Sequence, residues 1–204
     1  AAQLDANMHG AEAKQAMAAF DLDRENFLAA LQIAHDLADA SLVCQMVRSL
    51  ARYWCQSGSW AVADPWITSG CERAINLTAD QALEVLSRAA SYWYESQRFE
   101  RARGSAEHAI QVAESCHDIT TQCRMTTLSA GASYHLGQTQ RAVDQLHRLC
   151  DVAQAAGQIE AYNVAQNTLG NCYLTLGDLS RAASTFLACD AAHGNSITQA
   201  RTSL

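Results

Sequence analysis

The chain has 204 residues with a single proline, and its formal net charge at pH 7 is −7. Because proline marks turns and strand edges, one proline argues against a β-sandwich or barrel and excludes collagen and proline-rich disorder. A proline-poor chain rich in alanine is typical of an all-helical protein. The acidic balance argues against direct nucleic-acid contact, which would need a basic surface.

No stretch approaches the roughly 18 consecutive apolar residues of a membrane-spanning helix, and no signal peptide is recognisable. A cytoplasmic location is therefore expected. The chain begins with Ala1, which suggests a piece of a longer protein. None of the eight cysteines forms a CxxC pair, so we expect reduced thiols that pack as small apolar side chains. They are Cys44, Cys55, Cys71, Cys116, Cys123, Cys150, Cys172 and Cys189.

The N-terminal forty residues are expected to lead into a helical array. Residues 1–22 are predicted to be a weakly helical segment, and residues 23–40 to form a leading helix. Phe27, Leu28 and Leu31 lie near one face of that helix, a spacing typical of an amphipathic helix.

From residue 41 onward the chain repeats with a spacing of 39 or 40 residues. Alanine occupies one position in every unit, a small residue occupies a second, and a third is aromatic in three units of four. In chain order these columns are Ala63, Ala102, Ala142 and Ala182; Ala51, Ala90, Ala130 and Gly170; and Trp54, Trp93, Ser133 and Tyr173. Small residues allow two helix axes to approach, and rings fill the space beside them. A fixed period of this length predicts a solenoid.

The repeat predicts four units of two helices each. The units are expected at 41–78 (irregular), 79–117, 118–157 and 158–196, and residues 197–204 are a tail or the start of a further unit. The first helices are predicted at 41–57, 79–96, 119–136 and 158–176, and the second helices at 59–76, 98–116, 138–156 and 178–193.

Local signals support these helix ends. Gly58, Gly137 and Gly177 suit helix C-caps, and Thr78 with Gln81 forms a capping-box pattern. Pro65 lies inside the predicted helix 59–76, so that helix either begins near residue 64 or is kinked there.

The last unit resembles the tetratricopeptide repeat (TPR), a helix–turn–helix module. The resemblance rests on Leu169, Gly170 and Tyr173, followed by Gly177, Asp178, Ala182, Phe186 and Cys189. It implies an all-α fold, a right-handed α-solenoid of antiparallel helix pairs. The period exceeds the standard repeat of about 34 residues, and longer loops between units would explain the excess.

The segment 22–31, which reads LDRENFLAAL, resembles the helix that enters the C-terminal TPR region of bacterial STAND-class signalling ATPases and transcription regulators. This second resemblance implies an upstream ATPase domain that is not in the chain. It also implies the role of a sensor or interaction segment in a larger regulator.

The first helix of each TPR unit lines the concave groove, so its polar stripe is the candidate binding site. Asparagine can bracket a peptide bond, and arginine suits carboxylates or phosphates. The expected ligand is a peptide or protein, or a small inducer. The candidate residues are Arg48, Arg52, Gln56, Ser87, Ser91, Thr127, His135, Asn163, Asn167 and Asn171. A merely solvated polar face is the alternative interpretation of this stripe.

No catalytic motif is recognisable, and Cys116, His117 and Cys123 lack the second ligand pair that a zinc site needs. We therefore expect no enzyme, no cofactor and no metal. Two alternatives remain. The array could assemble with copies of itself without any external ligand, because uncapped solenoid ends seek partners. An enzyme with a reactive cysteine is the other.

Overall fold

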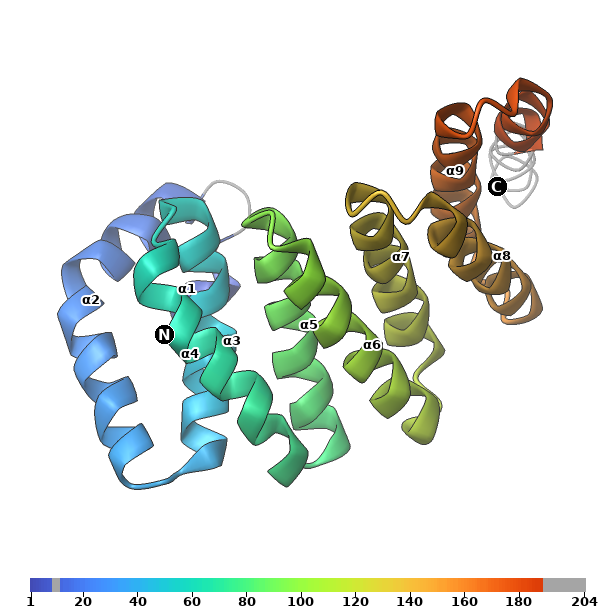
Figure 1. The fold of residues 1–204 in the computed structure, drawn as a ribbon. Coiled ribbons are helices and arrows are strands. Elements are labelled where there is room, and N and C mark those ends of the chain that lie inside the picture. Colours follow the sequence, from blue (N-terminus) through green and yellow to red (C-terminus); the bar gives the residue numbers. More distant parts are fainter. Residues whose placement is uncertain (9–11, 189–204) are drawn as a thin grey trace, which may run out of the picture. The chain divides into compact units, whose positions relative to one another are not determined.

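The computed structural model describes residues 1–8 and 12–188, and within these ranges the chain is helical without strands (Figure 1). The helices are α1 (Ala2–Ala6), α2 (Ala13–Asp36), α3 (Ala40–Ser57), α4 (Trp60–Arg73), the short 3₁₀ helix η2 (Ala74–Asn76), α5 (Ala79–Glu95), α6 (Phe99–Cys116), α7 (Ile119–His135), α8 (Thr139–Ala155) and α9 (Ile159–Thr175). Residues 179–188 are also helical. The chain forms two compact units, Ala1–Val112 and Ala113–Leu204, and the division falls within α6.

The helices themselves are long, and this accounts for the period of the repeat. From α5 to α9 each helix has 17 or 18 residues. Only two or three residues separate one helix from the next in this stretch. The expectation that longer loops explain the period was therefore wrong, because the additional residues lie in the helices.

Most turns contain a residue with a left-handed backbone, which ends one helix and redirects the chain. Gly58, Gly137 and Gly177 have φ values of 66°, 74° and 77°, as their C-cap prediction requires. Gln97 takes the same place with φ of 60°. The turn before α5 is formed differently, because there Thr78 and Gln81 make the predicted capping box at the helix N-terminus.

One helix boundary differs from the prediction. The predicted division between residues 22 and 23 lies inside α2, which runs unbroken through the leading segment. Nothing in that sequence stops a helix, because neither glycine nor proline occurs between Ala13 and Asp36. The helix predicted at 59–76 corresponds to α4 and η2, and because α4 begins at Trp60 and continues through Pro65, the alternative start near residue 64 is wrong.

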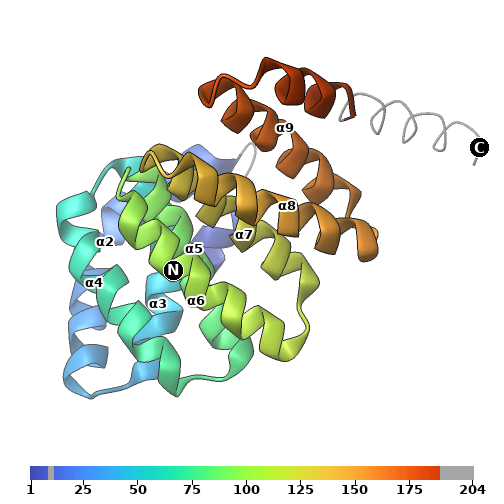
Figure 2. The ribbon, with the colours of Figure 1, turned by 45° about the vertical axis from the view of Figure 1, so that its right-hand side comes forward.

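The core of Ala1–Val112 surrounds α3, which packs against α1, α2, α4 and α5 (Figure 2). The predicted packing columns are buried: Trp54 is 1% exposed, Trp93 is 2% exposed, and Ala63 and Ala102 are fully buried. Arg101, which directly precedes Ala102 in the chain, places its guanidinium 4.7 Å from the centre of the Trp93 ring. The rings therefore provide a cation–π surface as well as filling the core.

In Ala113–Leu204, α8 packs against both α7 and α9. The repeat columns are again buried, as Ala130, Ala142 and Ala182 are at most 1% exposed. At Gly170 the backbone lies so close to Phe186 that a Cβ would be 2.4 Å from the ring. The small-residue column is thus required by packing, as the repeat register predicts.

Candidate functional site

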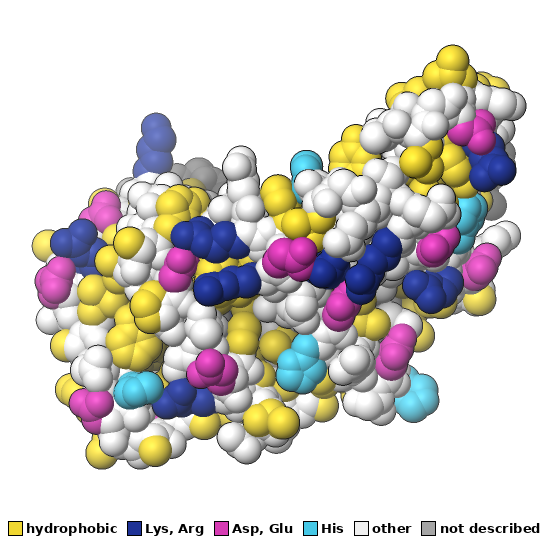
Figure 3. Space-filling view, in the orientation of Figure 1, with side chains coloured by type: hydrophobic (Ala, Val, Ile, Leu, Met, Phe, Trp, Pro, Cys, Tyr) yellow, Lys and Arg dark blue, Asp and Glu magenta, His cyan; other side chains and the backbone are white. Residues whose placement is uncertain are grey.

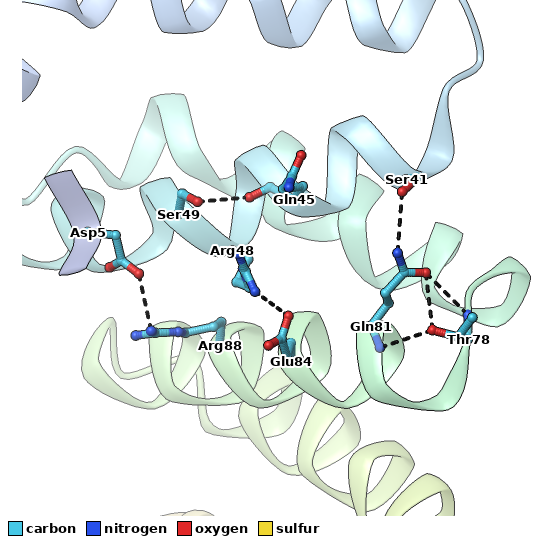
Figure 4. Close-up of polar contacts among 9 residues, drawn as sticks. All are labelled: Asp5, Ser41, Gln45, Arg48, Ser49, Thr78, Gln81, Glu84 and Arg88. Atoms are coloured by element: carbon cyan, nitrogen blue, oxygen red, sulfur yellow. Dashed lines mark hydrogen bonds and ion pairs between the residues drawn. The ribbon is translucent and has the colours of Figure 1, made fainter. Parts of the chain in front are cut away.

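The first helices of the two N-terminal helix pairs, α3 and α5, lie side by side and form a polar pocket between them (Figure 4). Ser41, Gln45 and Arg48 contribute from α3, and Gln81 and Glu84 contribute from α5. These side chains share a pocket because α3 and α5 are antiparallel partners of α4, which packs against both. Their donors and acceptors are therefore available together to one ligand.

The pocket is held by hydrogen bonds across the two helices. The Arg48 guanidinium on α3 pairs with the Glu84 carboxylate on α5. The Gln81 amide donates to the Ser41 hydroxyl at 3.5 Å, while the Gln81 side-chain oxygen accepts from Thr78. Because about half of the Glu84 side chain is exposed, the ion pair contributes at most about 1 kcal/mol. A ligand carboxylate can compete for Arg48 at little cost.

Next to this pocket a pair of arginines faces a buried carboxylate. Arg88 on α5 lies 3.3 Å from Oδ2 of Asp5, and Arg52 on α3 lies 3.8 Å from Oδ1 of the same residue. Asp5 belongs to α1 and its side chain is only 14% exposed. Figure 4 shows its carboxylate pointing from α1 toward Arg88 on α5. Two positive groups thus converge on one carboxylate, the arrangement expected of a carboxylate-binding site.

The thiol beside the arginine pair is a poor nucleophile. Burial and the neighbouring Glu95 carboxylate raise the pKa of Cys55, and Arg52 and Arg88 oppose that rise without cancelling it. Burial also raises the pKa of Cys44 and Cys150, each to about 11. A nucleophilic or metal-binding cysteine needs a low pKa, so these environments favour a structural role. Within residues 1–8 and 12–188 no three His, Cys, Asp or Glu side chains are placed to hold a metal ion.

The five candidate residues in Ala1–Val112 lie at different depths. Arg48 and Arg52 lie in the site described above, and Gln56 is exposed one turn further along α3. Ser87 is only 4% exposed, and its hydroxyl has no hydrogen-bond partner in the described part of the chain. Ser91 donates to the Ser87 carbonyl at 3.1 Å. Arg48, Arg52 and Gln56 are therefore the accessible part of this stripe.

The candidates in Ala113–Leu204 are also split between core and surface. Asn163 is buried at 9% exposure, whereas Asn167 and Asn171 are exposed on α9. The Thr127 hydroxyl donates to the Cys123 carbonyl at 3.0 Å, and His135 is exposed at the end of α7. The exposed asparagines alone fit the peptide-bracketing role predicted for them.

Sequence reasoning missed six residues of the site: Asp5, Ser41, Gln45, Gln81, Glu84 and Arg88. Glu84 and Arg88 are four residues apart and therefore lie on one face of α5, next to the predicted positions 87 and 91. That spacing of opposite charges was a usable signal. Asp5 gave none, because its pairing is a tertiary contact from a segment predicted to be weakly helical.

Basic and acidic side chains are interspersed on the face shown in Figure 3, with no large patch of one sign. This mixed surface differs from the basic stripe of a nucleic-acid groove. No described helix is both long and apolar enough to cross a membrane.

The solved structures most informative for this chain are helical-repeat proteins. A STAND signal-transduction ATPase with a tetratricopeptide repeat sensor, from Pyrococcus horikoshii, matches 93% of this chain with a TM-score of 0.68 and 15% identity, over 30% of its own length. Kinesin light chain TPR-like repeats from Podospora anserina match 89% of this chain and 98% of their own, with a TM-score of 0.65 and 14% identity. The fold is TPR-like.

A third neighbour is the aspartyl phosphate phosphatase F of Bacillus subtilis, with a TM-score of 0.64 and 12% identity, matching 75% of this chain. The chain spans only 40% of that protein and 30% of the STAND ATPase. No family model matches the sequence, and no curated protein matches it either. The TPR-like, all-α architecture of antiparallel helix pairs, of the α-solenoid class, is thus established by structure.

Proposed function

We propose that this chain is a non-catalytic TPR-like scaffold, the sensor or interaction segment of a larger cytoplasmic signalling regulator. It binds a peptide or protein through the polar face of α3 and α5. The observation that carries the proposal is the convergence of Arg48, Arg52 and Arg88 on this face, each already facing a carboxylate of the same chain.

The chemistry of this face favours an acidic ligand. Guanidinium groups bind carboxylates through parallel hydrogen bonds, and a low local dielectric strengthens each contact. Gln45 and Gln81 in the same pocket offer amides, which can donate to and accept from the backbone of an extended peptide. The likeness to a STAND protein with a TPR sensor supports the regulator context.

The test compares two fluorescently labelled pools of 12-residue peptides. The acidic pool contains Asp and Glu, and the neutral pool has Asn and Gln at the same positions. We expect the acidic pool to raise the anisotropy and the effect to weaken from 50 to 500 mM NaCl, because salt screens exposed charges over about 10 Å or less. The triple variant Arg48→Gln/Arg52→Gln/Arg88→Gln should lose this binding. Arg148→Gln, at an exposed site on α8, is the matched control. Equal binding of both pools, or by the triple variant and the control, would contradict the proposal.

Self-association is the second candidate function, and exposed apolar side chains on α2 favour it. Leu22 is 85% exposed, Ile33 is 59% exposed and Leu37, at the end of α2, is 73% exposed. Such residues at the first helices of a repeat array suit contact with another copy. Light scattering at increasing protein concentration distinguishes this role, since a Leu22→Ser/Ile33→Ser variant should remain monomeric where the unaltered chain associates. A mass that is independent of concentration in both would exclude this role.

A further inference from the structure

The arginine pair already has an occupant within the same chain. Helix α1 packs against α3 and places Asp5 between Arg52 and Arg88. We infer that α1 and the following residues to Met8 are a built-in competitor for this site, and that the partner is an acidic helical segment that displaces them. This inference rests on the proposed function, because it names the ligand class and the regulation of the same face.

Helix α1 contacts both α2 and α3, and none of its residues is buried. Met8 just beyond it is 3% exposed and serves as an apolar anchor. Asp5 and Met8 are thus two of the contacts that hold the segment against α2 and α3.

The docked carboxylate is incompletely satisfied. Oδ1 of Asp5 is buried and has no hydrogen-bond partner in the described structure, since Arg52 Nε stands 3.8 Å away. Oδ2 is 3.3 Å from Arg88. Charge-assisted hydrogen bonds are usually about 2.7–2.9 Å long, and arginine prefers to bind both carboxylate oxygens. A carboxylate from a partner that reaches both guanidiniums at that distance would bind better than Asp5 does.

The spacing within the occupant indicates what the partner presents. Asp5 and Met8 are three residues apart, so on a helical turn their side chains lie on the same face. Asp5 supplies charge to the arginines, and Met8 is buried as an apolar side chain at 3% exposure. A competing ligand should thus carry an Asp or Glu followed three residues later by a large apolar side chain, on a segment able to form one helical turn.

The experiment uses the full chain and a fluorescein-labelled peptide with the sequence of residues 1–8, AAQLDANM. Fluorescence anisotropy gives its Kd for the unaltered chain, for Asp5→Ala, for Asp5→Ala/Arg52→Gln/Arg88→Gln and for the control Asp5→Ala/Arg148→Gln. A tethered segment with an effective concentration of about 1 mM and an intrinsic Kd of about 0.1 mM weakens a free competitor by roughly ten-fold. We therefore expect Asp5→Ala to bind the peptide about ten times more tightly than the unaltered chain.

The other arms separate the possible failures. The variant Asp5→Ala/Arg52→Gln/Arg88→Gln should not bind the labelled peptide, and the control Asp5→Ala/Arg148→Gln should bind it as tightly as Asp5→Ala does. A peptide with Asn in place of Asp should bind neither to the unaltered chain nor to Asp5→Ala. Equal Kd values for the unaltered chain and Asp5→Ala would refute the competitor role. If the acidic pool still required the arginines, the proposed binding face would survive that result. Binding that persists without the arginines would refute both, and an absence of peptide binding to Asp5→Ala would refute the inference alone. Circular dichroism of each variant verifies folding.

Discussion

Two glycines in helix interiors have different surroundings and should respond oppositely to alanine. Gly104 in α6 is exposed, and a Cβ there would meet nothing within 4 Å. Gly170 in α9 is buried, and its Cβ would lie 2.4, 2.5 and 2.9 Å from three ring atoms of Phe186. Real Cβ atoms do not approach this closely, so the ring or the helix must move.

The magnitudes follow from two opposing terms. Alanine in place of glycine stabilises a helix interior by about 1 kcal/mol, and Gly104→Ala should gain most of this. At Gly170 the same gain is opposed by overpacking, which costs about 1–3 kcal/mol. We expect Gly170→Ala to lower the free energy of unfolding by about 0–2 kcal/mol. The Gly170→Ala protein should therefore be about 1–3 kcal/mol less stable than the Gly104→Ala protein.

The assay is urea unfolding followed by circular dichroism, repeated in a Phe186→Ala background. Removing the ring removes the clash, so Gly170→Ala should become stabilising there by up to about 1 kcal/mol, although Phe186→Ala itself costs stability. Gly104→Ala should shift the midpoint equally in both backgrounds. If Gly170→Ala has the same effect with and without the ring, the close contact does not explain why a glycine is needed.

Three further predictions concern polar contacts. Asp118→Ala removes the cap that accepts from the Thr121 amide at 3.0 Å, and should cost about 1 kcal/mol at pH 7 in thermal unfolding. Because hydrogen bonds from Thr121 lower the pKa of Asp118, that contribution is present above the usual value near 3.8 and is lost as the pH falls below it toward the lowered pKa, so the stability difference between the two proteins should narrow from pH 5 to pH 2. Tyr92→Phe removes the hydroxyl that donates to Asp64 at 2.5 Å and should cost about 1–3 kcal/mol in urea unfolding, an effect that would be absent if the bond were dispensable. Burial raises the pKa of Cys44 from 9.0 to about 11, so unfolding is coupled to thiol ionisation and stability should fall from pH 9 to 11, less steeply in Cys44→Ala.

The repeat columns allowed the fold to be predicted because packing fixes them. Ala142 and Ala182 sit where two helices approach, and each is at most 1% exposed, so a larger side chain would separate the helices. Turn positions were equally predictable, since Gly137 and Gly177 need a left-handed backbone. The helices α3 and α5 to α9 begin and end within about one residue of their predicted bounds. The leading segment was not divided where predicted, because few residues in α2 disfavour a helix.

The site was less predictable than the fold, for a physical reason. A polar stripe can be located from spacing alone, and Arg48 and Arg52 were found that way. Which charges meet depends on the angle between helices and on segments remote in sequence. Arg88 and Asp5 are 83 residues apart and still form an ion pair. Burial of Ser87, one position from Arg88, shows how a single step around a helix separates core from site.

The pairing of these arginines limits what a ligand can gain. Arg48, Arg52 and Arg88 each face a carboxylate of the chain, so a ligand exchanges one ion pair for another. Desolvation offsets much of the attraction in any such pair, and the net affinity gained from charge is small. Discrimination is larger, because a neutral segment forms no ion pair with the guanidiniums and a basic segment is repelled by them. This face is therefore suited to selecting an acidic segment over a neutral or basic one.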